Sequence, residues 1–308
     1  MTTDTLDTAG PAATSDAADV AESAWRAWRA QRVAGLGAPR GVLSLTAHHW
    51  LGAEPASVDG VPGLWWADDD GAHVRPDDGV PAAAGHGAVL LDADTLRPVE
   101  DVRTVVVAEA GSAVPFLVGA TGGATPRAAG ADLVGVELAL RTGRYLLRTR
   151  DPKAPALAAF VAAGDEVAVP AFAFDPAQVR DLPVRWYAEP RADVVDGAQP
   201  GVVHHVTVVG EVELDGATLG LVAGHQGGVT LSFTDRADGA PAWRAVHVPE
   251  ADVEASRDGV LRVDLNRATA YPSHFNDHGT CPRPLAGNDV PSAVEAGEKD
   301  PLGAMDTL

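Results

Sequence analysis

The chain has a single cysteine, Cys281, among its 308 residues. One cysteine excludes an internal disulfide. Long apolar runs are also absent, since none reaches the ~20 residues that a membrane-spanning helix needs. The first residues, Met1 to Asp4, lack the basic and apolar regions of a signal peptide. We therefore expect a soluble cytoplasmic protein.

Basic residues are scarce relative to acidic ones. The 23 Lys and Arg residues face 43 Asp and Glu residues, which gives a net charge of −20 with histidine neutral. Such an excess repels nucleic-acid phosphates and anionic lipids. Nucleic acid and membrane are therefore poor partners, and a small-molecule substrate is expected. The oligomeric state is left open.

Hydrophobic residues make up 46% of the chain, enough for a sizeable core, and 33 glycines and 23 prolines favour many turns over long helices. The composition predicts a mainly β fold. Residues 1–18 contain little to bury and are expected to form a disordered tail. A helix capped by Ser15 or Asp16 follows, with Trp25 and Trp28 docking it on the body.

Short apolar runs separated by Gly, Asp and Pro follow the helix, and they predict antiparallel strands in two packed β units of the sandwich or barrel type. The first unit, with the helix, is assigned to residues 19–151, a connecting segment with short helices to 152–183, the second unit to 184–299, and a tail to 300–308. Thr142–Arg144 and Asp215-Gly216 are typical of tight hairpin turns. Residues 191–200 are expected to be a linker. Expected strands cover 42–46, 88–92, 102–108, 114–118, 133–140, 145–150, 166–169, 184–188, 202–209, 211–214, 218–222, 229–233, 243–248 and 261–265.

The common catalytic and cofactor motifs are missing. The glycine-rich stretch at 119–125 lacks the Gly-Lys-Ser/Thr ending of a phosphate loop, so no nucleotide cofactor is indicated. There is no Gly-x-Ser-x-Gly, His-Glu-x-x-His or Cys-x-x-Cys.

Polar, ligand-capable side chains gather in residues 264–298, called here the signature segment. After the last expected strand it becomes too rich in Pro and Gly for regular structure, and a loop crossing the surface between the units is expected. His274, Asn276, Asp277, His278 and Cys281 lie within eight positions. Loops held by a rigid sheet are where binding and catalytic groups tend to lie.

The signature segment resembles the C-terminal part of the bacterial family catalogued as domain of unknown function 1684. The resemblance extends more loosely to the Gly41–Thr46 stretch, to Leu147-Arg148 with Asp151, and to Phe233-Thr234-Asp235, so that it covers roughly residues 28–299. It implies a β-rich fold and no agreed activity. The matching positions are Asp264, Asn266, Ala268, Pro272, Thr280, Cys281, Pro282, Pro284, Asn288, Ala296, Gly297 and Glu298.

The chain departs from this pattern in four positions of the loop. Ser273 stands where the family carries a cysteine, and His274, Asp277 and His278 replace Ala, Pro and Tyr. The matching polar residues Asp264, Asn266, Asn288 and Glu298 are interpreted as framework that satisfies backbone groups.

The substituted residues support a hypothesis of a metal site. If residues 273–278 form a helical turn, His274 and His278 share a face and could bind a divalent metal such as Zn or Fe, with Cys281 or Asp277 as third ligand. Metal-free acid/base use of a histidine, with Asp277 orienting it, is the second possibility. The third is that Pro272 and Gly279 prevent the turn, so that both histidines merely hydrogen-bond in the loop.

Other residues are candidates for substrate binding. His247 and Trp243 lie on one side of a predicted strand and could form a pocket wall, and Arg144, Arg148 and Arg150 could receive a substrate carboxylate or form salt bridges. The leading function is a cytoplasmic enzyme acting on a small organic molecule. A binding or structural protein without chemistry is the alternative.

Overall fold

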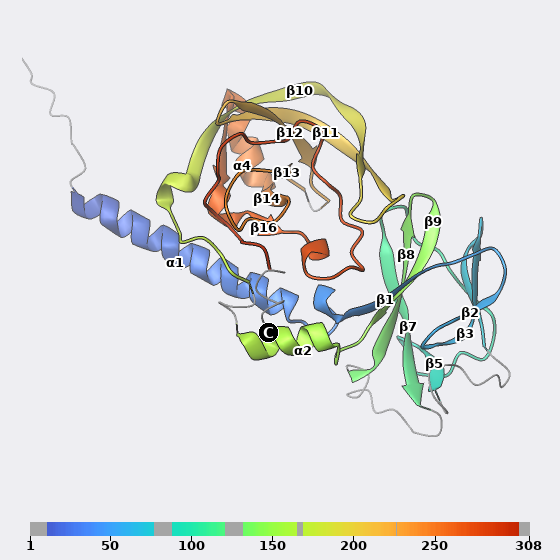
Figure 1. The fold of residues 1–308 in the computed structure, drawn as a ribbon. Helices are drawn as coiled ribbons and strands as arrows, with labels where there is room; N and C mark the ends of the chain where they lie inside the picture. Colours follow the sequence, from blue (N-terminus) through green and yellow to red (C-terminus); the bar gives the residue numbers. More distant parts are fainter. Residues whose placement is uncertain (1–10, 77–87, 121–131, 165–168, 226, 302–308) are drawn as a thin grey trace, which may run out of the picture.

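The computed structural model describes residues 11–76, 88–120, 132–164, 169–225 and 227–301. Most of the glycine-rich stretch at 119–125, most of the predicted strand at 166–169, and residues 1–10 and 302–308 lie outside them. The fold is mainly β, as predicted, with three antiparallel sheets (Figure 1). No helix in the described ranges is long and apolar enough to cross a membrane.

The first β unit pairs two sheets. A five-stranded sheet has the order β1-β9-β8-β7-β5, and a four-stranded sheet has the order β2-β3-β4-β6. Trp65 of the smaller sheet packs against Phe116 of the larger sheet, with ring centroids 5.8 Å apart, and both residues belong to one buried cluster. The strands are β1 (Leu45–Trp50), β2 (Ala56–Val58), β3 (Val61–Asp68), β4 (Gly71–Arg75), β5 (Ala88–Asp92), β6 (Arg103–Val105), β7 (Ser112–Ala120), β8 (Val134–Arg141) and β9 (Arg144–Arg150).

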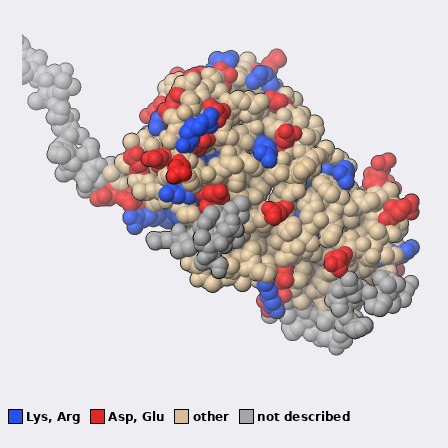
Figure 2. Space-filling view, viewed as in Figure 1, with Lys and Arg blue, Asp and Glu red and all other residues tan. Residues whose placement is uncertain are grey.

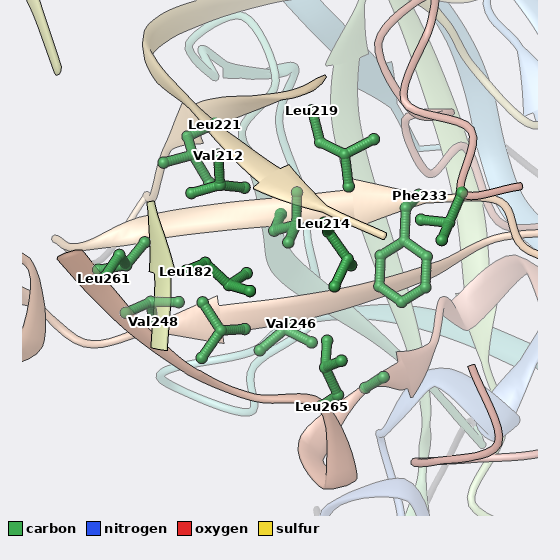
Figure 3. Packing of buried hydrophobic residues seen from close by; sticks show 14 of the residues in the cluster. Leu182, Val212, Leu214, Leu219, Leu221, Phe233, Val246, Val248, Leu261 and Leu265 are labelled. Carbon is green, nitrogen blue, oxygen red and sulfur yellow. The ribbon is translucent and has the colours of Figure 1, made fainter. Parts of the chain in front are cut away.

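The second β unit is one curled sheet of order β15-β10-β11-β12-β13-β14-β16. Its alternate apolar residues converge on a common interior (Figure 3) because side chains along a strand point to opposite faces in turn. Its strands are β10 (Val179–Asp196), β11 (Val203–Leu214), β12 (Ala217–Ala223), β13 (Val229–Phe233), β14 (Arg244–Val248), β15 (Val260–Asp264) and β16 (Thr269–Ala270).

Helical pieces join the two units. Helix α1 (Pro11–Leu36) runs along the second unit toward α2 (Pro155–Ala163), and α4 (Glu250–Ala255) precedes β15 (Figure 1). The end of α1, α2 and Phe275 share a buried cluster. Single 3-10 turns are η1 (Val42–Ser44), η3 (Pro176–Gln178), η4 (Ser256–Asp258), η5 (Leu265–Arg267) and η6 (Pro272–His274).

Several predicted boundaries differ from the structure. Helix α1 begins at Pro11, so residues 11–18 are helical rather than tail, and β10 continues to Asp196 through most of the expected linker. The strand expected at 42–46 is a 3-10 turn followed by β1. The hairpin turns are confirmed: Thr142 and Asp215 have φ of 55° and 49°, each followed by a glycine with positive φ.

Candidate functional site

The polar framework of the signature segment is confirmed. Asn266 makes a reciprocal pair of hydrogen bonds with the backbone of Asp175, at 3.0 and 2.9 Å. Asn288 likewise donates to the carbonyls of Gly220 and Ser232 and accepts from the Gly220 amide. These side chains replace the ladder partners that an irregular chain lacks.

Glu298 completes this framework at the end of the segment. Its carboxylate accepts from the Ala270 amide at 2.7 Å and pairs with Arg32 of α1 at 3.1 Å. The side chain is 2% exposed. The N-terminal helix is thereby fastened to the last part of the signature segment.

His274 does not face the other predicted ligands. It ends the three-residue turn η6 and packs edge-on against Trp243, with ring centroids 4.5 Å apart. Burial lowers the pKa of His274, and this shift is partly opposed by Asp300 and by a hydrogen bond with the Trp243 backbone. Its Nε2 and the Trp243 Nε1 have no hydrogen-bond partner in the described structure.

His278 and Asp277 are likewise separate. Because η6 ends at His274, His278 lies outside the turn and the shared face that four-residue spacing requires is not formed. The His278 amide instead donates to Asn276 Oδ1 at 2.9 Å. Asp277 is exposed, and within the described ranges only its backbone carbonyl is hydrogen-bonded, to Gln199. It therefore orients neither histidine.

The predicted metal site is not assembled. Cys281 lies beside Ser273, whose buried Oγ has no hydrogen-bond partner in the described structure, and burial raises the pKa of the Cys281 thiol. Among the residues that the structure describes, no three His, Cys, Asp or Glu side chains are grouped to hold a metal ion. The set His274, His278 and Cys281 is corrected accordingly, because a 3-10 turn replaces the required helical turn.

The predicted substrate-binding residues divide into two groups. Arg144 is exposed, and its Cζ lies 4.4 Å from the centroid of the Trp50 ring. Trp243 is covered by His274 and Arg283. Neither Arg144 nor Trp243 lines a described cavity. Arg148 and His247 do line cavities, but two different ones.

The larger of these cavities, called here the arginine cavity, lies between the five-stranded and seven-stranded sheets. Its volume is about 550 Å³. Strands β8 and β9 supply three arginines, β11 supplies two histidines, and the signature segment supplies one wall. No Asp or Glu is among its described lining residues. The outer surface differs, because acidic and basic groups are interspersed over the face shown in Figure 2. The polar lining consists of Arg141, Arg148, Arg150, His204, His205, His225, Thr207, Thr280 and Cys281.

The three arginines are held in different ways. Glu137, 2% exposed, binds Arg148 through two hydrogen bonds of 2.8 and 3.0 Å and Arg150 through one of 3.0 Å. The salt bridge predicted for Arg148 is therefore confirmed, and its role in receiving a substrate carboxylate stays a prediction. Two guanidinium groups share one carboxylate, so this cluster keeps a positive charge.

Arg141 has no ion pair within the described part of the chain. It donates to the carbonyls of Gly111 and Leu140 and to Thr280 Oγ1, at 2.6, 2.8 and 3.2 Å. Burial and then the charge of Arg148 lower its pKa, but a guanidinium remains protonated. These bonds use Nε and Nη1 of Arg141, and the bonds to Glu137 use Nε and Nη2 of Arg148, which leaves Nη2 of Arg141 and Nη1 of Arg148 as donors for a ligand.

His204 is half-buried on the same wall. Its Nε2 bonds the Thr280 carbonyl oxygen, which can only accept, so Nε2 carries the proton. Burial lowers its pKa. The neutral ring therefore keeps an acceptor at Nδ1.

Sequence reasoning missed Arg141 and the grouping of His204, His205 and His225 in this cavity. These residues lie in no motif, and they come from strands and a turn of both units. The one signal was the local run of arginines beginning at residue 141 in a chain of net charge −20.

Fold and site together define a mainly β protein with an arginine-lined cavity between two β units. Residues 167–299 match the family described as "Protein of unknown function (DUF1684)". The predicted resemblance is confirmed there, and its extension to residues 28–166 stays a prediction.

Other known proteins add little. No curated protein matches the chain. One similar solved structure is the solution NMR structure of an uncharacterized protein from Haloarcula marismortui. It is 22% identical, with a TM-score of 0.34, and the alignment covers 42% of this chain and 75% of that chain.

Proposed function

We propose that the protein binds a small organic anion, a carboxylate or a phosphate, in the arginine cavity. The observation that carries this proposal is the convergence of Arg141, Arg148 and Arg150 on a cavity whose described lining holds no carboxylate. Like charges repel, so such a grouping costs free energy unless a counter-charge joins it. A bound anion supplies that charge.

The donor geometry suits a carboxylate or phosphate head group. Guanidinium groups present planar N–H pairs that match these oxyanions. Arg148 is fixed by Glu137 and Arg141 by two carbonyls and Thr280, so their free N–H groups are held in place before an anion arrives. Little side-chain entropy is then lost on binding.

Isothermal titration calorimetry with inorganic phosphate and with acetate tests the proposal. Arg141→Met should lower affinity about tenfold to a hundredfold, because a hydrogen bond to a charged group contributes roughly 1.5–3 kcal/mol. Arg144→Met is the matched control. It removes an arginine from the same hairpin, but one that stacks on Trp50 outside the cavity, and affinity should be unchanged. Equal affinities in wild type and Arg141→Met would overturn the proposal.

Transformation of the bound anion is a second candidate function, favoured by His204. Its neutral ring lies on the cavity wall with Nδ1 able to accept a proton, as general-base chemistry requires. Turnover of small phosphate and carboxylate esters should be lost in His204→Gln and kept in His49→Gln, on β1 outside both described cavities. Equal turnover in both variants would remove His204 from this role.

A further inference from the structure

A second cavity adjoins the arginine cavity. Its volume is about 270 Å³, and the two cavities share five lining residues. The shared wall is formed by Val206, Val222, Ala223, His225 and Pro282. A molecule bound by the arginines therefore lies next to this second space.

The second cavity is mostly apolar, and several of its polar groups already have partners. Tyr271 and Ser232 hydrogen-bond each other at 2.7 Å, and Asn288 is bonded to the backbone of Gly220 and Ser232. Burial raises the pKa of Tyr271, which keeps its hydroxyl neutral. Apolar side chains from four strands and the signature segment supply much of the remaining wall: Val195, Val206, Val222, Ala245 and Leu285.

We propose that the ligand is an amphipathic anion, with its charged head among the arginines and an unbranched apolar tail in the second cavity. This inference rests on the proposed function. The two neighbouring spaces differ in the way such a molecule does. One is lined by three arginines, and the other has a mostly apolar surface in which the one arginine among the described lining residues, Arg283, is stacked on Trp243. Burial of the tail would then add affinity through the hydrophobic effect.

A series of straight-chain carboxylates measures the tail separately from the head. Calorimetry with acetate, butyrate, hexanoate and octanoate should show affinity rising about fourfold for each added methylene that is buried. Inorganic phosphate serves as a probe for the head site alone.

A variant that fills the second cavity should remove the dependence on chain length. Ala245 lies on β14 and lines only this cavity, so Ala245→Leu should flatten the series while phosphate affinity stays unchanged. Thr230→Leu on β13 is a second variant with the same expectation if Ala245→Leu folds poorly. Ala192→Leu, at an exposed position of β10 outside both cavities, is the matched control and should retain the rise.

The outcomes separate the two proposals. Phosphate binding that depends on Arg141, with no gain along the carboxylate series, would overturn the amphipathic ligand and leave the anion site standing. Absence of binding by every anion would overturn both. A rise with chain length that survives both Ala245→Leu and Thr230→Leu would place the tail elsewhere and also overturn the inference.

Discussion

Two arginines contact the signature segment in opposite surroundings. Arg244 is 0% exposed, pairs with Asp235 at 2.6 Å, and donates to the carbonyls of Val294 and Ala296. Arg141 also reaches the segment, at Thr280, but has no ion pair among the described residues and borders a cavity. The first is enclosed by its partners, whereas the second keeps an available donor.

The difference separates structural arginines from arginines that receive a ligand. Arg244 still has an unpartnered Nε in the described structure, but full burial keeps its guanidinium out of reach of an incoming molecule. One held by neutral acceptors keeps its positive charge for an anion. The comparison can be tested by removing Asp235, which pairs with Arg244, and Glu137, which pairs with Arg148 and Arg150 at the arginine cavity.

The largest effect is expected at Asp235. Asp235→Ala leaves Arg244 charged and buried without a counter-ion, which should lower the free energy of unfolding by about 3–5 kcal/mol. Urea denaturation measures it. The control is Asp181→Ala, which removes an exposed partner of Arg262 at 3.5 Å and should cause little change. A small loss in Asp235→Ala would mean that the carbonyls alone stabilise Arg244.

A smaller loss of stability, with a gain of binding, is expected at Glu137. Glu137→Gln keeps hydrogen-bonding atoms near Arg148 and Arg150 but removes the charge, so the free energy of unfolding should fall by about 2 kcal/mol. The net positive charge beside the cavity rises, and phosphate should bind several-fold more tightly by calorimetry. Glu211→Gln, which removes a partly exposed carboxylate paired with Arg185 outside both cavities, should leave phosphate affinity unchanged. Unaltered phosphate affinity in Glu137→Gln would contradict an electrostatic basis for binding.

The smallest expected effect is a dependence of stability on pH. Burial lowers the pKa of His48 and His204 below the usual 6.5, and Arg148 adds to the shift at His48. As pH falls below about 6.5, the unfolded chain binds protons that the folded chain resists, so the free energy of unfolding decreases between pH 7.5 and 5.5. Carboxylates remain ionised in this window. Urea denaturation in phosphate-free buffer should show a weaker slope in His204→Gln, and an identical slope would exclude His204 as a source.

Strands with strong local patterns could be predicted, whereas those decided by packing could not. The expected strands at 88–92 and 229–233 match β5 and β13. Strand β3 was missed because Pro62 and Gly63 interrupt its pattern, and contacts such as that between Trp65 and Phe116 compensate in the folded chain.

The site was harder to predict than the fold for a geometric reason. A four-residue spacing between His274 and His278 implies a shared face only in an α-helix, and the chain instead forms a short 3-10 turn after Tyr271. Arg141 and His204 are 63 positions apart by their numbering, and only the packing of two sheets brings them to one cavity. Such proximity leaves no trace in local sequence.

The fastening of α1 has a consequence for synthesis on the ribosome. Trp25 Nε1 donates to the Asn266 carbonyl and Arg32 pairs with Glu298, contacts that span 241 and 266 positions. Helix α1 is translated before these partners and cannot dock at both points until residue 298 has been translated. The apolar side of α1 therefore stays exposed to solvent until these partners have been translated. Contacts between residues so far apart in the sequence also form slowly.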